Sequence, residues 1–147
     1  MVRVAVVAVC LLLSGAAFAG GHGFNTGDKE LDVTLGKLNI DAKADKGNFI
    51  KSLSAAYKVP EKDIRALISK EGMRPADVYM AVRLSRMSKR PLGHVVRVYK
   101  GNKGKGWGVV ARRLGIEPGS KEFHVLRKGV PAGKRQKHGN KHGNKHG

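Results

Sequence analysis

Apolar residues recur at helical spacing along most of the chain after residue 60. Pro60, Pro75 and Pro91 each stand just before such a pattern, where the fixed φ angle of proline suits the start of a helix. A further pattern at i, i+3, i+4 and i+7 covers residues 107–114, and Ser120 can cap a last helix. The chain is therefore predicted to be mainly α, a single small helical domain of about five short helices.

Two segments before residue 60 fit more than one period. Apolar residues alternate on both sides of Gly36-Lys37, a two-residue turn signal, which predicts a two-stranded β-hairpin over residues 30–42. A helix is the open alternative, because four of these apolar residues also share one helical face. That face consists of Leu31, Leu35, Leu38 and Ala42. Residues 48–57 fit both periods and are predicted to form a helix.

The last part of the chain carries clear helix-end signals. Gly115 followed by Ile116 is typical of a helix ended by a left-handed glycine with an apolar contact beyond it. Pro118 then prevents the helix from continuing. The leading core candidates are Val82, Leu84, Val95, Tyr99, Trp107, Val110, Leu114 and Phe123.

A glycine-rich, lysine-rich loop precedes the only tryptophan. Free backbone N–H groups at a helix start, together with nearby lysines, favour capture of a phosphate or another anion. The alternative is structural: the glycines allow a sharp turn that brings Trp107 into the core. The candidate anion-binding residues are Lys100, Lys103, Lys105, Trp107, Arg112 and Arg113. A P-loop is excluded, because Trp107 and Gly108 stand where lysine and Ser/Thr are required.

Residues 103–124 read K-G-K-G-W-G-V-V-A-R-R-L-G-I-E-P-G-S-K-E-F-H. This run resembles the C-terminal signature of a group of uncharacterised small exported bacterial proteins. The resemblance extends back to about Leu31. It supports the domain limits given below and implies no activity.

The first nineteen residues have the pattern of a secretory signal peptide. Arg3 gives a basic start, an apolar run follows, and Ala17-Phe18-Ala19 is a small-x-small cleavage signal. Removal of residues 1–19 would also remove Cys10, the only cysteine, so the mature chain would contain no thiol. We expect an exported protein, periplasmic or extracellular, with no transmembrane anchor in the mature form. The predicted parts are a signal peptide (1–19), a disordered N-terminus (20–27), a basic helical domain (28–130) and a disordered tail (131–147).

Charge is large and unevenly distributed. The mature chain would keep 28 basic and 11 acidic residues, a formal net charge of +17. Residues 20–45 contain three Lys against five Asp/Glu, whereas residues 83–130 contain thirteen Lys/Arg against two Glu. Such an excess favours binding to polyanions, although a basic surface can also serve solubility alone. Genomic DNA is not an expected partner, because the leader takes the protein away from the chromosome.

Histidines at the two termini suggest metal binding. Cleavage after Ala19 would expose Gly20-Gly21-His22, which resembles the amino-terminal copper and nickel motif and offers four nitrogens in a plane to Cu(II) or Ni(II). The repeats around His138, His142 and His146 can bind Zn(II), Ni(II) or Cu(II), or can form a flexible basic extension.

Two functions from different classes follow from these observations. The leading hypothesis is an exported, non-enzymatic protein that binds an anionic envelope polymer, a lipid surface or another polyanion. The alternative is metal capture at the termini. No enzyme is predicted: Ser120, Glu122 and His124 are close in sequence, but nothing in the pattern places a nucleophile against its base.

Overall fold

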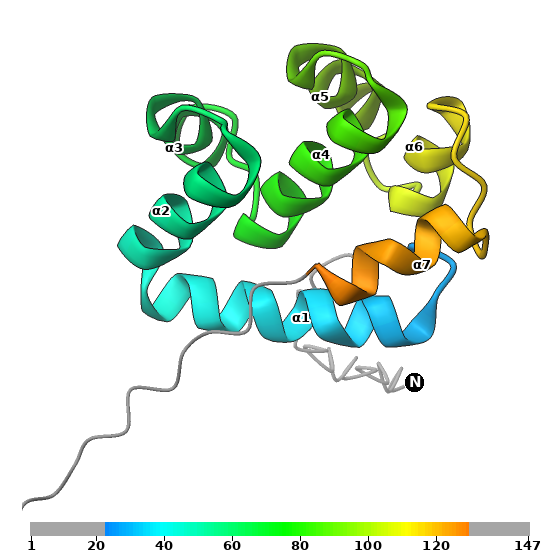
Figure 1. Cartoon of the computed structure of the whole chain (residues 1–147), viewed down its shortest axis with the longest axis horizontal. Coiled ribbons are helices and arrows are strands. Elements are labelled where there is room, and N and C mark those ends of the chain that lie inside the picture. The colour runs from blue at the N-terminus through cyan, green and yellow to red at the C-terminus, as the bar shows by residue number, and fades with distance from the viewer. Residues whose placement is uncertain (1–22, 130–147) are drawn as a thin grey trace, which may run out of the picture.

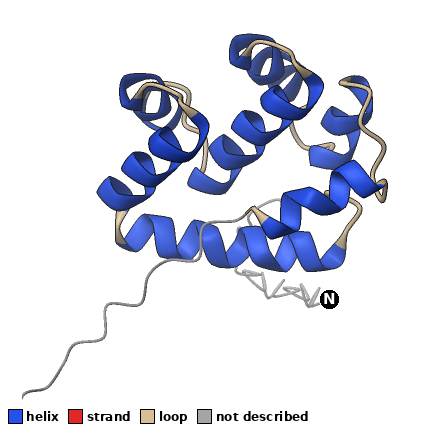
Figure 2. Ribbon diagram, viewed as in Figure 1, coloured by secondary structure: helices blue, strands red, loops and turns tan. Residues whose placement is uncertain are grey.

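A computed structural model describes residues 23–129, and every element within that range is a helix (Figures 1 and 2). The elements are α1 (Lys29–Ala44), α2 (Lys46–Tyr57), α3 (Glu61–Ser69), α4 (Pro75–Ser88), α5 (Leu92–Gly101), α6 (Trp107–Arg113) and α7 (Lys121–Lys128). The prediction of a small, mainly α domain is confirmed, with seven helices in the described residues rather than about five. The predicted leader and tail lie outside this range.

The predicted β-hairpin over residues 30–42 is wrong, because these residues lie within α1. Asp28 caps the helix by accepting hydrogen bonds from the amides of Glu30 and Leu31, at 3.0 and 3.1 Å. The alternative helical face is the buried one, while Val33 and Ile40 remain 74% and 69% exposed. An isolated two-stranded hairpin has little stability of its own, so the capped helix with an apolar stripe prevails.

A single residue separates α1 from α2. Asp45 ends α1 and also caps α2, accepting a hydrogen bond from the Asn48 amide at 3.0 Å. Phe49, Ile50 and Leu53 are buried, which confirms the helix predicted over residues 48–57. This tight junction makes α2 rise steeply from the end of α1 (Figure 1).

Helix α4 passes through the centre of the molecule. It contacts α1, α2, α3 and α5, and its residues from Pro75 to Val82 are all buried. Pro75 occupies the first turn of α4, as predicted, whereas Pro60 and Pro91 are the N-cap residues of α3 and α5. The result is two neighbouring helical hairpins, α2–α3 and α4–α5, standing on α1 (Figure 1).

Helices α6 and α7 close the fold and confirm the predicted end signals. Gly115 has a φ of +81°, Ile116 behind it is buried, and Ser120 accepts a hydrogen bond from the Phe123 amide at 3.1 Å. Six of the eight core candidates are buried, and the other two, Tyr99 and Leu114, pack partly buried against the core.

Helix α7 is held to the rest of the domain through its own backbone. The Tyr79 hydroxyl donates to the Leu126 carbonyl at 3.0 Å, and Arg83 donates to the Val125 carbonyl at 2.7 Å. Arg127 pairs with Asp28 and Glu30 beside the start of α1. The bonds from Tyr79 and Arg83 satisfy carbonyls that the last turn of a helix leaves without internal partners.

Residues 23–27 do not fit the prediction of a disordered N-terminus. Phe24 is 6% exposed and Thr26 is fully buried, and the Thr26 amide donates to Asp32 at 3.0 Å. The folded part of the chain therefore begins by Phe24 rather than at residue 28. The reason is the close approach of this segment to α6.

Candidate functional site: a basic surface on a buried anchor

Trp107 enters the core at the first position of α6. Its side chain is 1% exposed, its indole Nε1 donates to Asp77 Oδ1 at 2.8 Å, and its ring stacks on Tyr99 at 4.6 Å between centroids. Gly104 and Gly106 just before it have φ angles of +87° and +89°, a conformation that other residues rarely adopt. The structural interpretation of the glycine loop is the one that this geometry supports.

Asp77 gathers the polar groups around this tryptophan. The carboxylate is almost fully buried and binds Arg74 through two contacts, Nε–Oδ2 at 2.6 Å and Nη2–Oδ1 at 3.0 Å. Burial opposes the charge on Arg74, but Asp77 outweighs it and raises the pKa of Arg74. Burial, assisted by the same carboxylate, raises the pKa of Tyr99 to about 12. The cluster is thus an ion pair supported by hydrogen bonds, which is the form in which buried charge is tolerated.

Residues 23–27 occupy the backbone donors at the start of α6. The Trp107 amide donates to the Phe24 carbonyl at 2.8 Å, and the Gly108 amide donates to the Asn25 carbonyl at 3.0 Å. A Cβ at Gly108 would lie 2.8 Å from the Thr26 carbonyl oxygen, so only glycine permits this approach. The N–H groups expected to bind an anion are therefore used by the chain itself.

The cavity beside this cluster is too small for an organic ligand. It measures about 30 Å³ and is lined by residues of the cluster, among them Phe24, Arg74 and Asp77. That volume holds roughly one water molecule. The guanidinium of Arg74 also lies 4.2 Å from the centre of the Phe24 ring, a cation–π contact that closes the cluster on one side.

The six residues predicted to bind an anion do not form one group. Trp107 is buried and supports the fold. Lys100 forms an ion pair with Glu71. Lys103 and Lys105 are exposed in the α5–α6 loop, and two further exposed cations, Arg112 and Arg113, occupy the last turn of α6.

These four belong to a larger set of cations in the sequence. Residues 78–116 contain ten Lys/Arg and no Asp/Glu. Three of the ten have partners within the described chain: Arg83 and Arg86 donate to backbone carbonyls, and Lys100 pairs with Glu71. The other seven are exposed and form no ion pair within residues 23–129; we call them the basic surface. They are Lys89, Arg90, Arg97, Lys103, Lys105, Arg112 and Arg113.

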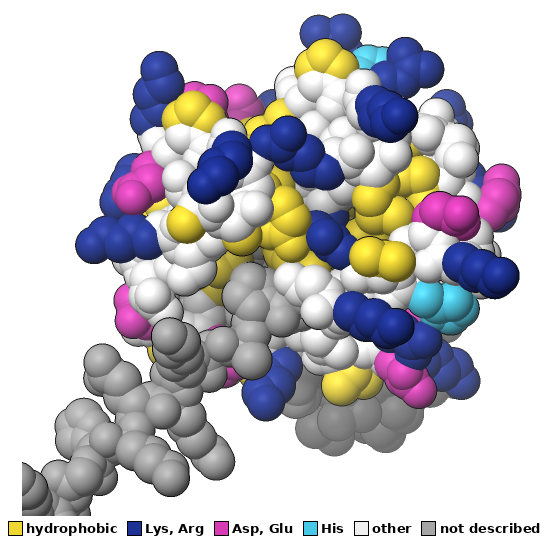
Figure 3. Space-filling view, viewed as in Figure 1, with side chains coloured by type: hydrophobic (Ala, Val, Ile, Leu, Met, Phe, Trp, Pro, Cys, Tyr) yellow, Lys and Arg dark blue, Asp and Glu magenta, His cyan; other side chains and the backbone are white. Residues whose placement is uncertain are grey.

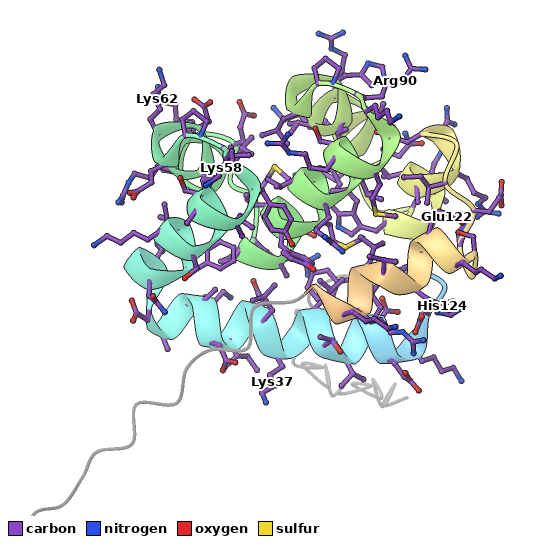
Figure 4. All side chains as sticks on the ribbon, in the orientation of Figure 1. Lys37, Lys58, Lys62, Arg90, Glu122 and His124 are labelled. Atoms are coloured by element: carbon purple, nitrogen blue, oxygen red, sulfur yellow. The ribbon has the colours of Figure 1, made fainter. Side chains whose placement is uncertain are left out.

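The view of one face agrees with this distribution. Around α5, Lys and Arg side chains gather with a histidine and without an acidic neighbour on that face (Figure 3). Arg90, labelled in Figure 4, projects from this end of the molecule. Lys89, Arg90 and Arg97 were not among the predicted site residues, although the absence of acidic residues between Asp77 and Glu117 was a signal for them.

Both histidines of the described chain lie on the surface. His94 is exposed, and His124 lies 3.7 Å from Asp28 and 2.9 Å from Arg127 on the surface. Residues 23–129 contain no group of three or more His, Cys, Asp or Glu side chains placed to hold a metal ion. The metal site predicted at Gly20, Gly21 and His22 and at the three tail histidines lies outside the described residues and stays a prediction.

Of the helices that the structure describes, none combines the length and the apolar character needed to cross a membrane.

Comparison of the chain with known protein families, with curated proteins and with solved structures gives no match in any of the three. The resemblance noted for residues 103–124 therefore also stays a prediction.

Proposed function

We propose that this protein is exported and attaches, without catalysis, to an anionic polymer or membrane surface through its basic surface. One observation carries the proposal: seven exposed Lys/Arg side chains in the α4–α5 turn, on α5, in the α5–α6 loop and on α6 form no ion pair within the described chain. Cations that only kept a protein soluble would be expected to alternate with acidic residues. Here no acidic residue interrupts the run between Asp77 and Glu117.

The rigidity of the underlying fold supports the same proposal. The α5–α6 loop that carries Lys103 and Lys105 is fixed at one end by the ion pair of Lys100 and at the other by buried Trp107. Cations presented by a fixed scaffold lose less conformational freedom on binding than cations on a loose segment. The basic surface is therefore suited to contact a repeating array of phosphates, sulfates or carboxylates.

The test is salt-dependent binding to heparin and to vesicles that contain an anionic lipid. In a test variant, four residues of the basic surface are changed to glutamine: Lys103, Lys105, Arg112 and Arg113. Each Lys or Arg near an anionic bilayer contributes about 1 kcal/mol, so the variant should bind up to about 4 kcal/mol more weakly. Its affinity should also depend less steeply on salt, because fewer counterions are released.

A matched control removes the same charge elsewhere. Four exposed lysines of α1 and α2 are changed to glutamine: Lys37, Lys43, Lys46 and Lys51. If attachment uses the basic surface, this control should keep most of its affinity. Equal losses in the two variants would mean that only net charge matters, and binding that ignores salt would refute the proposal.

A further inference from the structure

A groove of about 510 Å³ lies between α3 and α5, the two helices that pack on either side of α4 (Figure 1). This volume is within the range of about 300–1,000 Å³ typical of binding sites. Its walls carry both apolar and charged residues. The apolar residues are Ala66 and Leu67 of α3 and Leu92 and Val96 of α5; the charged ones are Asp63, Glu71, Arg97 and Lys100.

The groove is bridged near one end and open near the other. The ion pair of Lys100 with Glu71 joins the C-terminal ends of its two walls. Gly93 lines the groove near the other end, and a Cβ built on it meets nothing within 4 Å. Since Gly93 has neither a positive φ nor a close neighbour, the described fold itself does not require a glycine there.

The molecule also carries a helix face with two exposed apolar residues that packs against no described element. Val33 and Ile40 of α1 are the two most exposed large hydrophobic residues of the described chain, at 74% and 69%. With Gly36 and Lys37 they form the outer stripe of α1, at positions i, i+3, i+4 and i+7. This is the spacing by which an amphipathic helix lies in a groove. A Cβ at Gly36 would meet nothing within 4 Å, so a second backbone can come close there.

Groove and stripe lie on opposite sides of the molecule. Helices α2 and α4 stand between α1 and the pair α3 and α5 (Figure 1). In Figure 4, Lys37 of the stripe projects from the lower side and Lys62 of α3 from the upper side. One copy therefore cannot fill its own groove with its own stripe.

We propose that the outer stripe of α1 from a second copy docks in the groove between α3 and α5, joining copies head to tail. Charges at the edges of the two surfaces complement one another. The α3 wall carries Asp63 and the α5 wall carries Arg97. The stripe is flanked by Lys43 on one side and Asp41 on the other, because the two positions lie about 160° apart around the helix. Lys43 facing the α3 wall and Asp41 facing the α5 wall pair opposite charges on both sides.

Such a contact uses two different surfaces and leaves one of each free at the ends of every assembly. It therefore builds chains or rings rather than a closed twofold dimer. The inference is independent of the proposed attachment to polyanions, since no polyanion takes part. Repulsion between copies that each carry a large positive charge is screened beyond about 8 Å at physiological ionic strength.

The experiment uses the mature chain, residues 20–147, and measures its mass by sedimentation and light scattering. Small interfaces bind weakly, so protein concentrations up to about 1 mM are needed. In the stripe variant, Val33 and Ile40 are changed to Gln. In the groove variant, Gly93→Arg fills the groove. Gly101→Arg, on the same helix but outside the groove, is the matched control, because a Cβ there also meets open space.

The average mass of the wild type and of the Gly101→Arg control should rise with concentration, and that of the stripe and groove variants should stay monomeric. An equimolar mixture of stripe and groove variants should form heterodimers and nothing larger, because one intact groove meets one intact stripe. Circular dichroism should show all four proteins equally folded. A wild type that stays monomeric, an assembly that either variant leaves unchanged, or a mixture without heterodimers would overturn the proposal.

Discussion

Asp77 joins the polar groups buried in the C-terminal half of the domain. It holds Arg74 and the Trp107 indole at once, while only 1% of it is exposed to solvent. In the sequence it is an aspartate in the first turn of a helix, where a surface role in favourable contact with the helix dipole is the usual one. Its burial follows from the packing of α6 against α4 and α5, which no local pattern reveals.

We predict that Asp77→Asn destabilises the fold by about 3 kcal/mol, because it removes the negative charge that pairs with the partly buried Arg74. Chemical denaturation with urea, followed by circular dichroism and tryptophan fluorescence, measures the change. Asp41→Asn is the control. Asp41 is exposed on α1, and its substitution should change stability by less than about 0.5 kcal/mol. Equal stability of the two variants would show that the carboxylate contributes no net stabilisation.

At the scale of elements, secondary structure was predicted best where the apolar residues fit only the helical period and a helix-end signal follows them. Helix α6 had both, and its glycine end and the following Ser120 cap are found as expected. Helix α1 was missed because Val33 and Ile40 complete a β alternation and Gly36 suggests a turn. The physical reason for the helix lies in Asp28, whose cap supports a helical stripe that the hairpin could not bury as fully.

The association of residues 23–27 with α6 could not be read from the sequence, because the partners are about eighty residues apart. Only the repeated glycines at 104, 106 and 108 were visible, and they were interpreted as an anion loop or a turn. In the structure two of them, Gly106 and Gly108, are required by the close approach of the backbone at Asn25 and Thr26. Similarly, charge counts indicated which half is basic, but not that Lys100 is paired or that Trp107 is buried.

We predict that Gly108→Ala weakens the attachment of residues 23–27, although alanine favours a helix by about 1 kcal/mol. The added Cβ would lie 2.8 Å from the Thr26 carbonyl oxygen, so the segment must shift. Hydrogen exchange should be faster in residues 23–31, and the thermal midpoint should fall. Gly101→Ala has open space around its Cβ and should keep or raise the midpoint. A higher midpoint in both variants would mean that the close approach does not constrain position 108.

At the scale of the whole molecule, positive charge exceeds what the fold neutralises. Residues 23–129 contain 23 Lys/Arg and 11 Asp/Glu. Ion pairs on the surface, such as Arg65 with Glu61, typically contribute about 0–1 kcal/mol each and weaken as salt is added. Mutual repulsion of the remaining cations destabilises the compact state and also weakens with salt. Added salt therefore lowers stability by weakening the ion pairs and raises it by weakening the repulsion. Whether the net stability rises or falls with salt shows which effect is larger.

We predict that repulsion is larger and that the thermal midpoint rises as sodium chloride is increased from low to physiological concentration. A gain of about 1 kcal/mol corresponds to about 4–8 °C for a domain of this size. The variant with glutamine at Lys103, Lys105, Arg112 and Arg113 should start at a higher midpoint and rise less, because part of the repulsion is already gone. A midpoint that falls with salt would show that the ion pairs stabilise the fold more than repulsion between the unpaired cations destabilises it. Binding of an anionic partner to the basic surface would then relieve no net repulsion.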